Sequence, residues 1–330
     1  MIFDAGVVGF VGLGHMGLPM TGRLVAAGYQ VRGFDTSAQA RRNFAAIGST
    51  DAVDGGSVGG GAAGRDGGAK AGRVTVVDTL GAVGDGADVV ILMLPDSDAV
   101  ERVLLGASAD GRPGGGGRRD GLLARLPDGA TVIDMSSSDP ARTKALAVTL
   151  AAAGVTLIDA PVSGGVAGAR AGTLTVMVGG PTEAFERFRP MLAAMGSRVA
   201  HAGDVGAGHA VKALNNLMSA AHLLASSEAL IAGQRFGLDP AIMLEIVNSS
   251  SGRSWSTQNK WPAFVLTETY DAGFGLRLMV KDIKLALAIE QAMGTASAAS
   301  AAVVAAWEAA AADLPADADH TAIARWVADH

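Results

Sequence analysis

The sequence predicts an α/β fold, in which a doubly wound parallel sheet is followed by an all-α domain and a long helix joins the two. Three observations support this fold class. Short apolar runs alternate with helix-compatible segments as far as about residue 203. Beyond that point no convincing strand is visible, and the stretch 206–237 continues with Gly233 as the only interior breaker after Gly208 near its start. At about 1.5 Å per residue such a helix can cross a whole molecule, so we interpret it as the connection.

The expected strands are short apolar runs bounded by Gly, Pro or Asp. They are residues 7–11, 30–34, 88–94, 131–135, 156–160 and 173–178. Amphipathic helices are expected between them at 17–27, 38–47, 100–105 and 140–153. The repeated order of strand and helix is typical of a parallel sheet with helices on both faces.

Length sets the number of domains. The 330 residues correspond to about two domains of ordinary size. We place the boundary so that the first domain is 1–204 and the second is 205–330. The alanine-rich helices after about residue 240 lack polar coverage, so we expect this second domain to pair with its own copy, as a homodimer or a tetramer.

Composition excludes several classes of protein. A hydrophobic fraction of 49% with 18% charged residues indicates a chain that folds, and a net charge of −6 argues against a nucleic-acid partner. The absence of cysteine removes disulfides and thiolate chemistry. Neither apolar stretch, 210–233 or 296–312, is suited to a membrane span, because one carries several polar residues and the other is mostly alanine. No signal peptide is visible, so we expect a cytoplasmic protein.

Two Gly-rich stretches, 54–72 and 106–121, interrupt the pattern. They are nearly free of large apolar side chains, so they cannot offset the entropy of ordering, and we expect surface loops. A phosphate-binding loop is the alternative, but it needs a Lys-Ser/Thr pair and a following helix that neither stretch supplies.

A glycine motif at the end of the first expected strand predicts a dinucleotide site. Its residues are Gly12, Leu13, Gly14, His15, Met16 and Gly17. The first glycine permits the tight turn, the second lets the backbone approach a pyrophosphate, and the third lets the helix pack against the strand. The first domain is therefore expected to be a Rossmann-type domain that binds NAD(P).

The second strand ends at Asp35, 23 residues after Gly12. A carboxylate there accepts both ribose hydroxyls of adenosine and repels a 2′-phosphate, so NAD is predicted over NADP. An ordinary helix cap before Thr36 and Ser37 is the alternative interpretation of Asp35, and the nearby Arg41 and Arg42 weaken the preference.

Seven sequence blocks, in order along nearly the whole chain, resemble those of the β-hydroxyacid dehydrogenase family, the group of 3-hydroxyisobutyrate dehydrogenase. The blocks are GLGHMGLPM at 12–20, MLP at 93–95, DMSS at 134–137 followed by Pro140, DAPVSGG at 159–165, GHAVKALNN at 208–216, SSGRSW at 250–255, and GF at 273–274 through LMVKD at 278–282. The resemblance implies a nicotinamide-dependent oxidation of a small hydroxy acid.

Lys212 and Asn216 stand at i and i+4 on one helix face, so both can meet one substrate oxygen. The family assigns the acid/base role to the matching lysine. An ordinary lysine is a poor base at neutral pH, so we expect burial and a second cation such as Lys281 to lower its pKa. The alternative is a lysine on a solvated face, which the apolar neighbours in 210–218 disfavour.

Further site residues follow from the same edge of the sheet and from the resemblance. Ser163, Gly164 and Gly165 are expected to hold the substrate carboxylate, with a plain turn as the alternative. The remaining candidates are Leu94, Pro95 and Ser137 for the cofactor, Lys281 for cofactor and substrate, Arg253 and Trp255 for the substrate, and Phe274 as an apolar wall near the cofactor. The alternatives are a structural ion pair for Arg253, a core position for Trp255 and a simple pairing with Asp282 for Lys281. The histidines show no metal-ligand spacing, so no metal is expected.

The sequence therefore predicts an NAD-dependent enzyme that oxidises the 3-hydroxyl of a small acid, 3-hydroxyisobutyrate or a four-carbon sugar acid, with Lys212 as acid/base. Three alternatives remain open: reduction of a semialdehyde, an imine reductase on the same scaffold, and a dinucleotide sensor without catalysis. The lysine counts against the last two.

Overall fold

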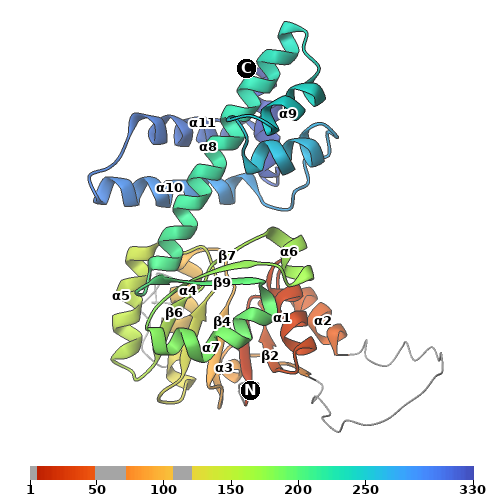
Figure 1. Cartoon of the computed structure of the whole chain (residues 1–330). Helices are drawn as coiled ribbons and strands as arrows, with labels where there is room; N and C mark the ends of the chain where they lie inside the picture. Colours follow the sequence, from red (N-terminus) through yellow and green to blue (C-terminus); the bar gives the residue numbers. More distant parts are fainter. Residues whose placement is uncertain (1–5, 49–71, 107–120) are drawn as a thin grey trace, which may run out of the picture. The chain divides into compact units, whose positions relative to one another are not determined.

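The computed structural model describes residues 6–48, 72–106 and 121–330. The chain divides into two compact units, Met1–His209 and Ala210–His330 (Figure 1). The two Gly-rich stretches, 54–72 and 106–121, lie outside the described residues except for residues 72, 106 and 121.

The first unit is built on a nine-stranded sheet, in which the path β3-β2-β1-β4-β5-β6-β8-β7 is completed by β9 pairing with β8. The strands are β1 (Val8–Val11), β2 (Gln30–Phe34), β3 (Arg73–Val76), β4 (Val89–Leu92), β5 (Thr131–Asp134), β6 (Thr156–Asp159), β7 (Val162–Ser163), β8 (Thr175–Gly179) and β9 (Arg198–Gly203). The first six strands are parallel, and the order reverses between β1 and β4. In an open parallel sheet that reversal is where ligands bind.

The sequence predicted six of these strands and missed β3, β7 and β9. β7 has only two residues, and every residue of β3 and β9 is partly or fully exposed, so neither forms a buried apolar run. The sheet is also not wholly parallel, because β8 runs antiparallel to β6 and β7. This hairpin-like end lies where the chain leaves the repeating strand-helix order.

Helices cover both faces of this sheet (Figure 1). They are α1 (Gly17–Ala26), α2 (Ala38–Ile47), α3 (Gly81–Gly84), α4 (Ser97–Leu105), the short 3₁₀ helix η2 (Leu122–Arg125), α5 (Pro140–Ala151), α6 (Gly165–Ala171) and α7 (Thr182–Met195). Side chains cap several of them: Ser37, Asp96 and Asp139 accept hydrogen bonds from the first-turn amides of α2, α4 and α5. These caps explain why the predicted starts of α2 and α5 agree with the structure.

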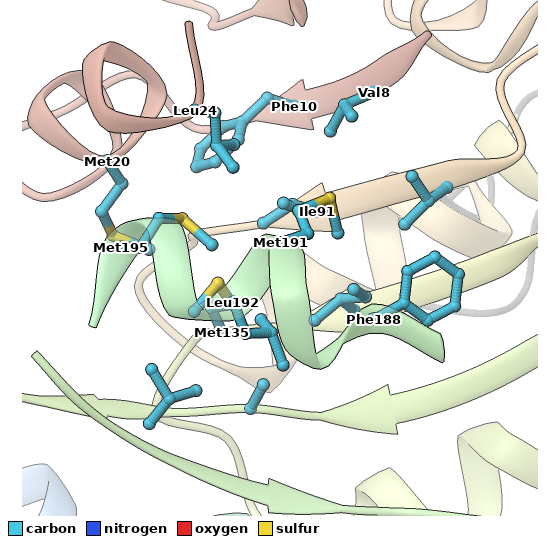
Figure 2. Close-up of a cluster of buried hydrophobic side chains, with 14 of the residues drawn as sticks. Val8, Phe10, Met20, Leu24, Ile91, Met135, Phe188, Met191, Leu192 and Met195 are labelled. Atoms are coloured by element: carbon cyan, nitrogen blue, oxygen red, sulfur yellow. The ribbon is translucent and has the colours of Figure 1, made fainter. Parts of the chain in front are cut away.

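Helix α7 contributes to an apolar core of the first unit, although the sequence analysis did not predict this helix. Phe188, Met191, Leu192 and Met195 lie fully buried along it, at helical spacing. Figure 2 shows them packed toward β1 and β4 and toward side chains of α1 such as Met20. Pro190 inside α7 obscures this periodicity in the sequence. A second apolar cluster, with Val90, Val132 and Leu150, packs beneath α3, α4 and α5.

The second unit is helical. Its elements are the part of α8 (Ala207–Phe236) from Ala210 onward, α9 (Pro240–Asn248), the π-helix η3 (Ser256–Val265), α10 (Leu276–Ala292), α11 (Ala298–Asp313), the 3₁₀ helix η4 (His320–Ala322) and α12 (Ile323–Asp329). The core contains Trp261, Trp307 and Ile283, and the Trp307 indole donates to the Ala220 carbonyl on α8 at 3.3 Å. The long helix predicted at 206–237 is therefore confirmed.

Candidate active site

The glycine motif forms a tight turn between β1 and α1. Gly12 has a φ of +98°, and a Cβ there would lie 2.2 Å from the Met93 carbonyl oxygen. A Cβ on Gly17 would lie 1.8 Å from the Gly12 oxygen, whereas a Cβ on Gly14 meets nothing within 4 Å. The outer two glycines are therefore required by packing, and Gly14 leaves an open backbone surface beside the exposed His15. These features fit a dinucleotide pyrophosphate.

Asp35 follows β2 and is tied to the same turn. Its Oδ2 accepts from the Leu13 amide at 2.8 Å, and its Oδ1 accepts from the Ser37 amide at 2.7 Å. The side chain is half-buried, and Ser37 rather than Asp35 caps α2. Arg41 donates to the Asp35 backbone carbonyl at 2.6 Å, so a cation lies near this residue. The carboxylate is held next to the turn and keeps lone pairs for ribose hydroxyls.

The loops after β4 and β5 meet at the reversal point. The Leu94 amide donates to Ser136 Oγ at 2.9 Å, which joins the two loops. Asp134 is buried and accepts from the Ser136 amide and the Ser138 hydroxyl, so it shapes the second loop. Pro95 is exposed and Ser137 is half-buried. The structure therefore brings the predicted residues Leu94, Pro95 and Ser137 to the same edge as the glycine turn.

Ser163 ends β7, and two glycines with positive φ follow, Gly164 at +129° and Gly165 at +63°. L-residues rarely adopt these conformations, so the turn depends on glycine. Ser163 and Gly165 are half-buried, Gly164 is exposed, and a Cβ on Gly165 meets nothing within 4 Å. The segment thus offers a hydroxyl and accessible backbone to an anion.

Asp159 and His209 fix the beginning of α8. Asp159 accepts from the Gly206 and His209 amides at 2.6 and 2.8 Å. The His209 ring is hydrogen-bonded to Thr143 Oγ1 at 2.9 Å and to the Ser136 carbonyl at 3.0 Å. All these groups are buried within the first unit. The sequence analysis did not predict this positioning role of His209, because its partners come from distant segments.

Within the second unit, Lys212 and Asn216 lie one turn apart on α8. Lys212 is half-buried and Asn216 is buried. Asn216 Nδ2 donates to Asp282 Oδ2 at 2.7 Å, which fixes the amide, and Lys281 Nζ lies 3.3 Å from Asp282 Oδ1. Both charged residues belong to α10. The structure therefore assembles Lys212, Asn216 and Lys281 around the buried carboxylate of Asp282, which the sequence analysis did not single out as a site residue.

Burial lowers the pKa of Lys212, which is the direction that a lysine base requires. The carboxylate of Asp282 opposes this effect, and the positive charge of Lys281 adds to it. The sequence analysis expected both burial and a second cation to act in this way. The charge of Asp282 is the contribution it did not foresee.

The remaining predicted residues of the second unit are more exposed than the buried Asn216 and Asp282. Arg253 is exposed, and Trp255 is 69% exposed, so Trp255 is not a core residue. Phe274 is half-buried, and its carbonyl accepts from the ring of His320 at 3.0 Å. Nothing in these contacts brings Arg253 or Trp255 to Lys212.

The described residues contain no group of three His, Asp or Glu side chains suited to a metal ion. In the same part of the chain, no helix is both long enough and apolar enough to cross a membrane. A cytoplasmic location stays a prediction.

Two family models match almost the whole chain. Residues 7–203 match the NAD-binding domain of 6-phosphogluconate dehydrogenase, and residues 206–327 match a domain described as NAD-binding of NADP-dependent 3-hydroxyisobutyrate dehydrogenase. Together they cover both the glycine turn and the α8 residues.

Curated relatives agree with these matches. The chain is 39% identical over 292 residues to a 3-hydroxyisobutyrate dehydrogenase of Pseudomonas aeruginosa, covering 87% of this chain and 86% of the relative. It is 36% identical to an NAD-dependent L-serine dehydrogenase of the same organism (88% and 87% covered). It is also 36% identical to the 2-(hydroxymethyl)glutarate dehydrogenase of Eubacterium barkeri (85% and 81% covered).

Among solved structures, a Mycobacterium tuberculosis 3-hydroxyisobutyrate dehydrogenase with L-serine matches with a TM-score of 0.80 and 29% identity, covering 97% of this chain and 98% of that one. A Streptomyces aurantiacus imine reductase, 18% identical with a TM-score of 0.56, shares the fold alone.

The fold, the dinucleotide turn and these matches define an NAD(P)-dependent 3-hydroxyacid dehydrogenase. The chain belongs to the β-hydroxyacid dehydrogenase family, within its 3-hydroxyisobutyrate dehydrogenase-like group.

Proposed function

We propose that this enzyme oxidises the 3-hydroxyl of a small 3-hydroxy acid with NAD, and that Lys212 is the acid/base. The observation that carries the proposal is the pair on α8: a lysine whose pKa is lowered by burial, one turn from an amide fixed by Asp282. The nicotinamide, when bound, accepts the hydride from the carbon that bears the hydroxyl.

Lys212 takes the hydroxyl proton as the carbonyl forms and returns it in the reverse reaction. Asn216 donates to the same oxygen through its second amide hydrogen, because Asp282 occupies the first. Ser163, Gly164 and Gly165 bind the substrate carboxylate, and Lys281 contacts both substrate and cofactor. Arg253, Trp255 and Phe274 are proposed as outer contacts of the substrate or cofactor.

Asp35 is the residue that selects NAD. Its carboxylate lies beside the turn that receives the pyrophosphate, where it suits ribose hydroxyls and repels a 2′-phosphate. Leu94, Pro95 and Ser137, on loops joined through the Leu94–Ser136 hydrogen bond, line the nicotinamide side.

The substrate test is a turnover screen with NAD and NADP separately. The panel contains 3-hydroxyisobutyrate, L-serine, 2-(hydroxymethyl)glutarate and threonate, and the readout is absorbance of the reduced nicotinamide. We expect turnover of at least one acid, with NAD preferred. Firm NAD binding without turnover of any acid would contradict the proposal and favour a dinucleotide sensor.

We also propose that the helical unit pairs with its copy, as a dimer or tetramer. Phe236, at the end of α8, is 85% exposed, and Ile242 and Ile246 on α9 are exposed as well. Large apolar side chains gathered on neighbouring elements are typical of an interface. Light scattering of the wild type and of Ile242→Glu tests this. An unchanged molar mass in the variant would show that this surface is not the interface.

A further inference from the structure

Lys260 is an amine that the proposed chemistry leaves unused. It lies on η3, is half-buried, and its Nζ donates to Ser219 Oγ on α8 at 2.9 Å. The sequence analysis did not single it out, although the candidate substrate residues Arg253 and Trp255 lie shortly before it in the sequence.

The hydrogen bond places this amine beside the helix face that carries the acid/base pair. Ser219 follows Lys212 by seven residues and Asn216 by three, so the three side chains share one face of α8. At the helical rise, Ser219 lies about 4.5 Å beyond Asn216 and about 10 Å beyond Lys212 along the axis. A substrate whose hydroxyl is at Lys212 needs only a short extension to reach Lys260.

Lys260, unlike Lys281 and Lys284 of the same unit, forms no ion pair with a carboxylate in the described part of the chain. Lys281 lies 3.3 Å from Asp282, and Lys284 lies 2.6 Å from Glu308. Within the described chain no carboxylate oxygen is inside ion-pair distance of Lys260. Asp319 is the acidic group that acts on Lys260 through its charge, but its oxygens accept from the amides of Gly273, Phe274 and Thr321.

No carboxylate is paired directly with the Lys260 ammonium in the described part of the chain. Burial and the charge of Lys212 lower the pKa of Lys260 to about 8, although the charge of Asp319 opposes them. Burial and the charge of Lys260 both lower the pKa of His320 on η4, and its hydrogen bond to Asp319 opposes them. An incoming anion would supply the missing counter-charge, because a partly desolvated ammonium is stabilised by pairing.

We propose that Lys260 binds a second carboxylate of the substrate, so that the preferred substrate class is a 3-hydroxy acid with two carboxylates. The substrate hydroxyl then lies at Lys212. This inference rests on the proposed function, and Lys260 acts in it as a specificity-determining residue.

Two matched substrates test the inference. 2-(Hydroxymethyl)glutarate and 2-(hydroxymethyl)pentanoate share the reacting hydroxyl and first carboxylate, and they differ in whether a carboxylate or a methyl ends the side arm. We expect the wild type to favour the dicarboxylate at least tenfold in kcat/KM. Lys260→Met should remove most of that preference, through KM, and Lys260→Arg should restore part of it. Lys284→Met, a lysine paired on the surface of the same unit, is the matched control and should keep the wild-type preference.

Two results would overturn the inference: a wild-type preference near one, or a preference that Lys260→Met leaves intact. If the hydrogen bond to Ser219 has only a structural role, Lys260→Met and Ser219→Ala should slow turnover of both substrates equally. The preference should also decline as pH rises through about 8, because Lys260 then loses its proton.

Calorimetry with glutarate separates this inference from the proposed function, because it needs no turnover. At pH 8 the wild type should bind glutarate with proton uptake, measured in buffers of different ionisation enthalpy, and Lys260→Gln should bind it at least tenfold more weakly. Turnover of hydroxy acids with glutarate binding unaffected by Lys260→Gln contradicts only the role of Lys260. Glutarate binding that requires Lys260, without turnover of any hydroxy acid, contradicts only the reaction.

Discussion

The two units differ in which groups form their candidate sites: backbone turns in the α/β unit and side chains in the helical unit. In the α/β unit the candidate site residues are largely backbone, namely the cofactor turn at Gly12 and the substrate turn at Gly164, whose positive φ and close contacts require glycine. In the helical unit they are side chains from three elements: Lys212 on α8, Asp282 on α10 and Lys260 on η3. A backbone site is encoded by neighbouring residues, whereas a side-chain site depends on tertiary packing.

The largest expected effect belongs to the side-chain site. Lys212→Ala removes the proposed acid/base, so kcat should fall by about 10² to 10⁴. The dinucleotide turn lies in the other unit and keeps its contacts, so NAD affinity, measured by fluorescence titration, should stay within about twofold of wild type. Lys284→Ala, which breaks only the surface pair with Glu308, is the control. Near-wild-type turnover of Lys212→Ala would remove this lysine from the mechanism.

A pair of glycine variants tests the backbone site. Gly17→Ala places a Cβ 1.8 Å from the Gly12 oxygen, so we expect the free energy of unfolding to fall by about 3 kcal/mol and NAD binding to be lost. Gly14→Ala meets no atom within 4 Å, so stability should change by less than about 0.5 kcal/mol while NAD affinity falls. Thermal unfolding measures the stability of each variant, and titration measures its NAD affinity. Equal stability of the two variants would refute the packing argument.

The same difference explains what the sequence could predict. Gly12, Gly17 and Asp35 follow strands at fixed spacing, so the local sequence pattern was enough to predict where they lie. The α7 helix was missed because Pro190 hides its periodicity, and β9 because its side chains are mostly exposed. Asp282 was passed over, although it neighbours Lys281, because only the contact with Asn216 across 66 residues reveals its role. Lys260 needs the packing of η3 against α8.

Asp35 provides a smaller effect, in which cofactor choice is the readout. Asp35→Asn keeps an acceptor for the Leu13 amide but loses the negative charge. The KM for NAD should rise about tenfold, because a charge-assisted hydrogen bond is weakened, and the KM for NADP should fall as repulsion of the 2′-phosphate is removed. Steady-state kinetics with both cofactors measure the ratio, and an unchanged ratio would assign Asp35 to the turn alone.

The smallest expected effect is a pair of opposite shifts in the pH profile. Lys281 lowers the pKa of Lys212, so Lys281→Met should raise that pKa and move the acidic limb of kcat/KM to higher pH. Asp282 raises the same pKa, so Asp282→Asn should move the limb to lower pH, and the asparagine oxygen can still accept from Asn216. Activity on that limb depends on unprotonated Lys212, so it rises with pH in every variant. Shifts of the same sign in both variants would show that the limb reports a group other than Lys212. Opposite shifts would establish that charges on α10 set the proton affinity of a base on α8.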